Sequence, residues 1–262
     1  MPELEFYQYA IAIIGGAFAG ALNTLAGNGS AITLTILTEV LQLPPNMANG
    51  TNRVGIFTQS SAGAYAFYRH GKLDIKRSRS YFVYTIIGAI VGVIVATRVS
   101  NEQFKSVFSI LMVAMLFVIL VKPKRWLIQT DPNRKVHPLI IIPAFLALGF
   151  YGGFIQMGMG IFFLAVMVLL ARFSIIEANA VKSFIIAIYT FIVILIFQSK
   201  GLINWQLGLL MAVGQTTGGW LTASYASRYP KADVWAYRLL VVVVIFAIVR
   251  LFGIVEWIQA LL

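Results

Sequence analysis

Two positively charged side chains, Arg53 and Lys182, stand a few residues inside long apolar segments in the two halves of the chain. Arg53 ends a polar stretch at residues 46–53, and Lys182 lies in a fainter copy of it at residues 177–183. An offset of 130 residues aligns Asn49 with Asn179 and brings Arg53 next to Lys182 in the alignment. Charged groups inside a membrane are costly and usually functional. We therefore expect this pair to bind a negatively charged solute.

Amide and hydroxyl side chains surround both cations. Helical spacing puts Asn49 and Arg53 on one helix face with Asn52 at its flank, and it groups Asn179 with Lys182 in the same way. Such a cation suits an oxyanion, because it supplies charge together with several hydrogen-bond donors. Two alternatives are that each cation only reaches back to the nearest lipid headgroups, or that Lys182 only pairs with Glu177. The substrate-binding residues predicted from these two stretches are Arg53, Lys182, Asn49, Thr51, Asn52, Asn179 and Ser183.

Two glycine-rich breaks each precede an unusually short apolar segment, at residues 30–43 and 160–173. Short segments at matched positions in two halves of a chain are typical of a transporter's binding site. The start of such a helix presents free N–H groups and the positive end of its dipole to an anion. The alternative is that the glycines only allow close helix packing. The residues that the breaks add to the candidate site are Gly27, Asn28, Gly29, Ser30, Gln156, Gly158 and Gly160.

Catalytic and metal-binding residues are not expected. The chain has no Cys, and its two His, His70 and His137, stand beside loops. A serine protease within the membrane needs a general base near its nucleophile, and a metalloprotease needs a His pair such as H-E-x-x-H. Neither pattern is present in the sequence. We therefore expect no enzyme activity, no metal and no cofactor.

The composition predicts a membrane protein with all-α architecture. Of the 262 residues, 60% are hydrophobic and 11% are charged, against about 25% charged in an average soluble domain. The mean hydropathy is +0.86. The net charge of +11 is interpreted as a topology signal in loops that face anionic lipid headgroups, and not as a sign of nucleic-acid binding.

Ten apolar segments fall into two sets of five. A span needs about 20 residues, and eight of the ten segments reach or approach that length. We predict a first transmembrane repeat at residues 1–122, a cytoplasmic linker at 123–137 and a second repeat at 138–262. The segments are 6–27, 30–43, 47–68, 80–98 and 104–121, then 138–157, 160–173, 178–198, 205–224 and 236–255.

Basic residues set the expected orientation. Five lie in residues 69–79 and five in residues 122–137, and two spans separate these two loops, so both are assigned to the cytoplasm. Five spans in each half is an odd number, and the second half is then inverted relative to the first. Both termini become periplasmic. Arg53 is then about 9 Å deep from one face and Lys182 about 8 Å from the other, so both can reach one central cavity if their helices are neighbours.

Other matches between the halves follow the same order, such as residues 71–74 with 201–204, and Gly88 and Gly92 with Gly214 and Gly218. A set of short motifs runs in order along the chain: residues 19–20 and 27–29, residues 44–53, residues 68–74, residues 149–153, residues 158–160, residues 178–182 and residues 201–205. This ordered set resembles the TauE/SafE family of bacterial anion transporters over nearly the whole chain. The resemblance implies movement of sulfur-containing anions, such as sulfite, sulfoacetate or other organosulfonates, often by export.

We therefore predict a secondary transporter of the bacterial inner membrane that moves a small sulfur-containing oxyanion by alternating access, most simply as an exporter. A membrane potential of 100 mV, negative inside, favours expulsion of each negative charge by about 2.3 kcal/mol. The alternatives are an anion channel, an uptake permease for another small organic anion, or a membrane partner protein without transport. The expected partners are the anionic substrate, the lipid bilayer and, as a further option, other copies of the chain.

Overall fold

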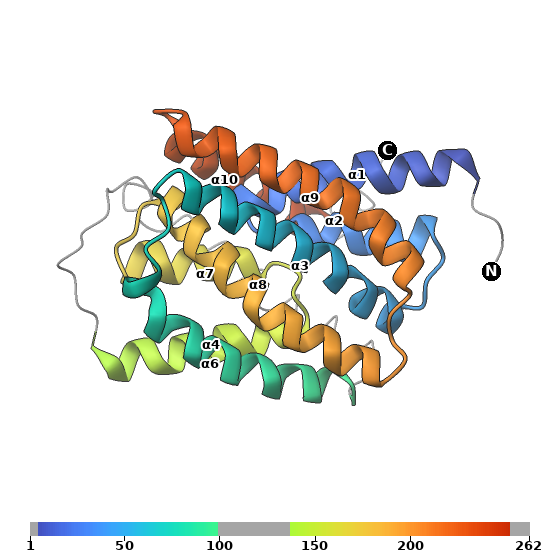
Figure 1. Cartoon of the computed structure of the whole chain (residues 1–262), viewed down its shortest axis with the longest axis horizontal. Helices are drawn as coiled ribbons and strands as arrows, with labels where there is room; N and C mark the ends of the chain where they lie inside the picture. The colour runs from blue at the N-terminus through green and yellow to red at the C-terminus, as the bar shows by residue number, and fades with distance from the viewer. Residues whose placement is uncertain (1–4, 99–136, 252–262) are drawn as a thin grey trace, which may run out of the picture.

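The computed structural model describes residues 5–98 and 137–251, and this part of the chain is helical with no strand (Figure 1). The first half contains α1 (Phe6–Leu25), α2 (Gly29–Thr35), the π-helix η1 (Ile36–Val40), α3 (Pro45–Arg69) and α4 (Ile75–Ala96). The second half contains α6 (Pro138–Phe154), α7 (Met159–Ala165), the π-helix η3 (Val166–Leu170), α8 (Ile175–Ser199), α9 (Trp205–Arg228) and α10 (Ala232–Leu251). The prediction of an all-α polytopic protein is confirmed.

The order of elements in the first half recurs in the second. In each half a short α-helix of 7 residues continues into a π-helix of 5 residues and is followed by a helix of 25 residues. A residue with positive φ lies two positions after each π-helix, namely Gln42 (φ 53°) and Arg172 (φ 59°). A glycine with positive φ then follows each long helix, at Gly71 and Gly201. The predicted linker and the segment at 104–121 lie outside the described residues, and the inverted orientation of the halves in a membrane stays a prediction.

Glycines join each half to the other at two helix pairs. In the α1–α9 pair, a Cβ on Gly20 would overlap the main chain of Gln215, and a Cβ on Gly218 would overlap the main chain of Ala17. The α4–α6 pair repeats this arrangement with Gly88, Gly92, Gly149 and Gly153. Small residues let helix backbones approach closely where hydrophobic burial contributes little, as in a membrane. The halves are therefore interlocked, because each pair takes one helix from each half.

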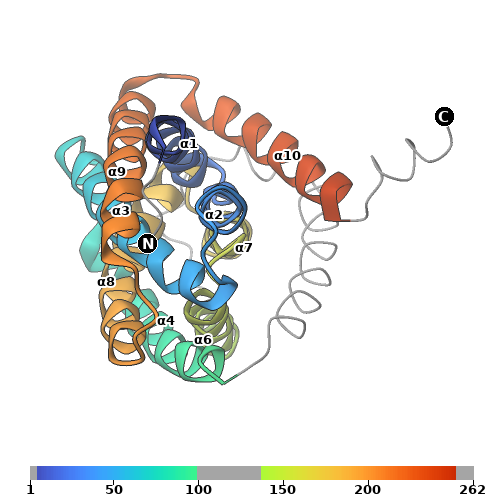
Figure 2. The same cartoon turned by 90° about the vertical axis from the view of Figure 1, so that its right-hand side faces the viewer.

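The short helices α2 and α7 lie inside the bundle. Seen from one end, α1 and α6 lie beyond them in opposite directions, with α3, α8 and α9 along one side (Figure 2). The long helices α3 and α8 contact each other, as the sequence analysis required for its two cations to meet. This arrangement brings the breaks that precede α2 and α7 to the middle of the bundle, beside the helices α3 and α8 that carry Arg53 and Lys182.

Fewer helices meet strict criteria for a membrane span than the sequence analysis expected. Within the described residues, α1 and α8 are both long and apolar enough, and shorter apolar helices occur at Gly29–Val40, Tyr81–Ala96, Pro138–Phe154 and Met159–Leu170. The helices α3 and α9 have 25 and 24 residues, so their length suffices for about 30 Å of hydrocarbon. Buried polar side chains such as Asn49, Asn52 and Gln215 lower their hydropathy, and these face the bundle interior.

Candidate functional site

The two chain breaks cross each other in the middle of the bundle. Gly27, with φ of 82°, separates α1 from α2, and Gly158, with φ of 74°, separates α6 from α7. A Cβ on Gly27 would overlap the main chain of Gly160, and a Cβ on Gly160 would overlap Gly27. Gln156 also has a positive φ of 59°, which is uncommon for a residue other than glycine. One glycine of each predicted break, Gly27 and Gly160, therefore lies in contact with the other.

Arg53 is fully buried and binds the C-terminal end of α6. Its Nη1 donates to the carbonyl oxygen of Gly152 and to Oε1 of Gln156, both at 2.7 Å. Its Nη2 donates to the carbonyl oxygen of Gly153 at 3.2 Å and to Oδ1 of Asn49 at 3.3 Å. The last carbonyls of a helix lack partners within the helix and form the negative end of its dipole. A guanidinium placed there donates hydrogen bonds to these carbonyl oxygens, and its positive charge interacts favourably with the negative end of the dipole.

Lys182 has the same role at the C-terminal end of α1. Its Nζ donates to the carbonyl oxygens of Asn23 at 2.7 Å and Thr24 at 3.0 Å, and to Oδ1 of Asn179 at 2.5 Å. The amide nitrogen of Asn179 in turn donates to the carbonyl oxygen of Leu25 at 3.1 Å. An ammonium has three N–H donors, so each of them has an acceptor here. Lys182 therefore holds the α1 end as Arg53 holds the α6 end.

Neither cation extends to the surface. Arg53 is 0% exposed and Lys182 is 2% exposed, which contradicts the alternative that both only reach back to lipid headgroups. Each comes from the half of the chain opposite to the helix end that it binds. The two cations therefore also hold the two halves of the chain together, close to the two breaks.

Four buried polar atoms, two at the start of α2 and two on α3, have no hydrogen-bond partner in the part of the chain that the structure describes. They are Oδ1 of Asn28, Oγ of Ser30, Nδ2 of Asn52 and Nε of Arg53. The hydroxyl of Thr33 donates to Oδ1 of Asn52 at 2.7 Å, which holds the Asn52 amide beside α2. Buried polar groups are nearly always paired, so an unpaired group in a native structure needs an explanation. Two of the four atoms are donors, one is an acceptor, and the hydroxyl can be either.

Some of the remaining predicted residues contact one of the two cations, and others do not. Asn49 and Gln156 belong to the Arg53 cluster, and Asn179 belongs to the Lys182 cluster. Thr51 lies apart from both, because its Oγ1 accepts from the main-chain N–H of Asn204 at 2.9 Å, at the start of α9. Ser183 is buried, and Gly29 packs so closely on α1 that a Cβ would overlap the carbonyl oxygen of Ala19.

The sequence analysis missed Tyr189. This residue is fully buried, and its hydroxyl donates to Oε1 of Gln156 at 2.8 Å, the same atom that accepts from Arg53. A Tyr inside an apolar segment looks like any other large core residue, so no sequence pattern could have identified Tyr189 as part of the site. The acceptors of Lys182 could not be predicted from the sequence either, because two of them are main-chain carbonyls. Among residues 5–98 and 137–251, no group of three His, Cys, Asp or Glu could hold a metal ion.

A helical bundle with two breaks that cross at its centre, and with two buried cations on the broken ends, is the architecture of a polytopic membrane transporter. Residues 12–251 match the family model described as sulfite exporter TauE/SafE. The chain therefore belongs to the TauE/SafE family.

Several curated relatives cover most of the chain. The probable membrane transporter protein ORF9 of Sinorhizobium sp. is 30% identical over 256 residues, which cover 96% of this chain and 95% of the relative. The probable membrane transporter protein YfcA of Escherichia coli K12 is 26% identical over 201 residues, covering 76% and 74%. A probable membrane transporter protein of Xylella fastidiosa is 24% identical, covering 88% and 89%. No solved structure gives a significant match. The family match and these relatives identify the chain as a membrane transporter.

Proposed function

We propose that the chain is a secondary transporter of small sulfur-containing oxyanions and that the substrate binds where the two breaks cross. The observation that carries this proposal is a pair of buried donors on consecutive residues of α3, Nε of Arg53 and Nδ2 of Asn52, which have no acceptor within residues 5–98 and 137–251. An oxyanion supplies several acceptor oxygens and a negative charge, which is the complement of a guanidinium and an amide. The family description, sulfite exporter, supports both the sulfur oxyanion and the export direction.

The roles of the two cations differ in this proposal. Arg53 keeps one free donor and binds the substrate directly, while its other donors fix the α6 end. Lys182 has all three donors engaged and positions the α1 end. The hydroxyl of Ser30 contributes a further donor from the start of α2, whereas the free atom of Asn28 is an acceptor and does not bind the anion directly. Because the element order recurs in both halves, alternating access follows when the halves exchange conformations about the crossing.

Substitution of Asn52 tests the site, with a second buried amide as a matched control. Asn52→Leu removes one donor to a charged ligand, worth about 1.5–3 kcal/mol, and we expect sulfite affinity to fall by roughly 10- to 100-fold. Gln215→Leu removes an amide that is equally buried and also lacks protein partners, but it lies between α9 and α3, where a Cβ on Gly55 would overlap it. We expect this control to bind sulfite as the wild type does.

Binding is measured by calorimetry on purified protein with sulfite, sulfoacetate and a carboxylate analogue, and transport is measured in proteoliposomes. Equal affinity of the two variants for every anion would contradict the proposed site. Single-channel currents through the purified protein would instead favour an anion channel, because a transporter turns over too slowly to give them. Net uptake against the potential would favour the uptake permease.

A further inference from the structure

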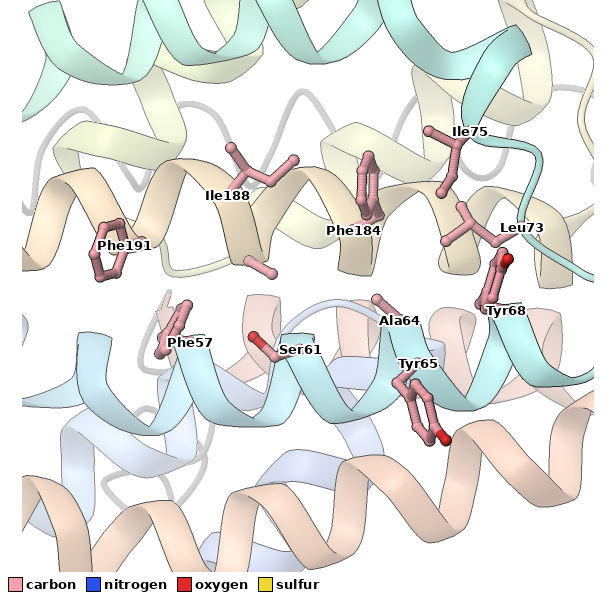
Figure 3. Close-up of a pocket in the computed structure, with 11 residues that line it drawn as sticks. Phe57, Ser61, Ala64, Tyr65, Tyr68, Leu73, Ile75, Phe184, Ile188 and Phe191 are labelled. Atoms are coloured by element: carbon pink, nitrogen blue, oxygen red, sulfur yellow. The ribbon is translucent and has the colours of Figure 1, made fainter.

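A groove of about 530 Å³ runs along the outer face of the bundle between α3 and α8 (Figure 3). Its walls are aromatic and aliphatic, with Phe57 and Tyr68 on α3 and Phe184 and Ile188 on α8. Several lining side chains remain open to the surroundings, and Tyr65 and Tyr68 are 57% and 58% exposed. The groove is separate from the crossing of the two breaks, where the polar site lies. Its volume falls within the range of 300–1,000 Å³ typical of ligand pockets.

The length of the groove corresponds to one leaflet of a membrane. From Phe57 to Tyr68 it follows α3 for 11 residues, which is about 16 Å at 1.5 Å per residue. The hydrocarbon core of a bilayer is about 30 Å thick, so this length is about half of it. The rings of Phe57 and Phe191, with centroids 5.7 Å apart, lie at the end near the middle of α3. The other end lies at Leu73 and Ile75, where α3 gives way to α4.

The end at Leu73 and Ile75 is basic. Arg69, in the last turn of α3, is exposed, and Lys72 is half-buried two residues after His70. Arg228 of α9 lies at the same end, because its Nε donates to Nε2 of His70 at 2.8 Å. Residues 69–79 hold five basic residues and one acidic residue. An apolar groove that opens onto such a segment complements a ligand with a long hydrocarbon chain and an anionic head.

We propose that this groove is a binding site for one acyl chain of an anionic phospholipid, with the headgroup phosphate beside Arg69 and Lys72. The chain lies against α3 and α8 together, and its terminal methyl group lies near Phe57 and Phe191. A second copy of the protein fits less well, since a two-fold axis along the membrane normal would bring two basic segments together, and like charges oppose association. This site rests on the membrane location of the chain and is independent of the transported substrate.

Filling the groove tests the proposal. The purified full chain is titrated with phosphatidylglycerol, and bound lipid is counted by native mass spectrometry, with phosphatidylcholine of the same acyl chains as comparator. Ala64→Trp places an indole in the groove. If the indole displaces about two methylene groups of the acyl chain from the groove, lipid binding becomes roughly tenfold weaker. Val213→Trp, on an exposed position of α9, is the matched control and is expected to bind as the wild type does. Arg69→Gln with Lys72→Gln is expected to abolish the preference for phosphatidylglycerol.

A second measurement tests the proposal even if Ala64→Trp does not fold. Phe191→Trp places a fluorescent reporter at the inner end of the groove, and we expect one equivalent of phosphatidylglycerol brominated near its chain end to quench it. Equal binding by Ala64→Trp and wild type, equal affinity for the two lipids, or an unquenched reporter would each overturn the proposal. A change of oligomeric state in Ala64→Trp with lipid binding unchanged would also overturn it, and would assign the groove to contact between copies.

Discussion

Replacement of Lys182 by Met should destabilise the protein far more than replacement of an exposed lysine. The Met side chain has a similar length, so packing is nearly kept while three hydrogen bonds are lost. The carbonyl oxygens of Asn23 and Thr24 and the side-chain oxygen of Asn179 then lose a buried donor, and each unsatisfied buried group costs about 1–3 kcal/mol. Removal of the ammonium avoids its own desolvation, which offsets part of this loss. We expect a net decrease of about 3 kcal/mol in the free energy of unfolding.

The control for this prediction is Lys200→Met, since Lys200 is exposed just after the end of α8. Thermal unfolding in detergent compares the two variants with the wild type. Hydrogen exchange adds a local measurement, because the amides of residues 23–30 should exchange faster when Lys182 no longer holds the end of α1. If Lys182→Met unfolds at the same temperature as Lys200→Met and its residues 23–30 remain protected, the interpretation of Lys182 as the partner of this helix end is wrong.

Two further substitutions separate local effects at the crossing. Gly27→Ala should abolish expression of folded protein, because its Cβ would overlap the main chain of Gly160. Gly71→Ala, at a glycine with a similar positive φ but open space around it, should lower the free energy of unfolding by only about 1 kcal/mol. Equal yields of folded protein from the two variants would contradict the close contact of the two breaks. Tyr189→Phe should lower stability by about 1 kcal/mol through loss of its hydrogen bond to Gln156, and an unchanged unfolding temperature would show that this bond contributes nothing.

The fold class and the positions of the breaks could be predicted from the sequence. Composition alone indicates an apolar helical bundle, and Gly27 and Gly158 mark the breaks because positive φ is readily available only to glycine. The recurrence of elements at an offset of about 130 residues was also visible, since short motifs such as residues 71–74 and 201–204 survive in both halves.

The contacts of the candidate site could not be predicted in the same way. The sequence shows that Arg53 and Lys182 are buried cations, but it does not show that main-chain carbonyls of Gly152 and Asn23 are their acceptors. Main-chain groups carry no residue-specific signal. The π-helices η1 and η3 were likewise missed, because the i→i+5 main-chain bond that defines them, such as the one from Leu41 to Ile36, is rare and carries no residue-specific signal.

The interlocked glycine pairs constrain how the chain is made. As synthesis proceeds, α1 and α4 enter the membrane before either has its counterpart, because α9 and α6 belong to the second half. The glycine face of α4 must therefore remain against lipid, or against a chaperone, until α6 (Pro138–Phe154) has been made, and the face of α1 must wait until α9 (Trp205–Arg228) has been made. Premature release of the first half would leave the glycine faces of α1 and α4 without their partner helices α9 and α6. Cutting the chain between the two halves after assembly would not separate the halves.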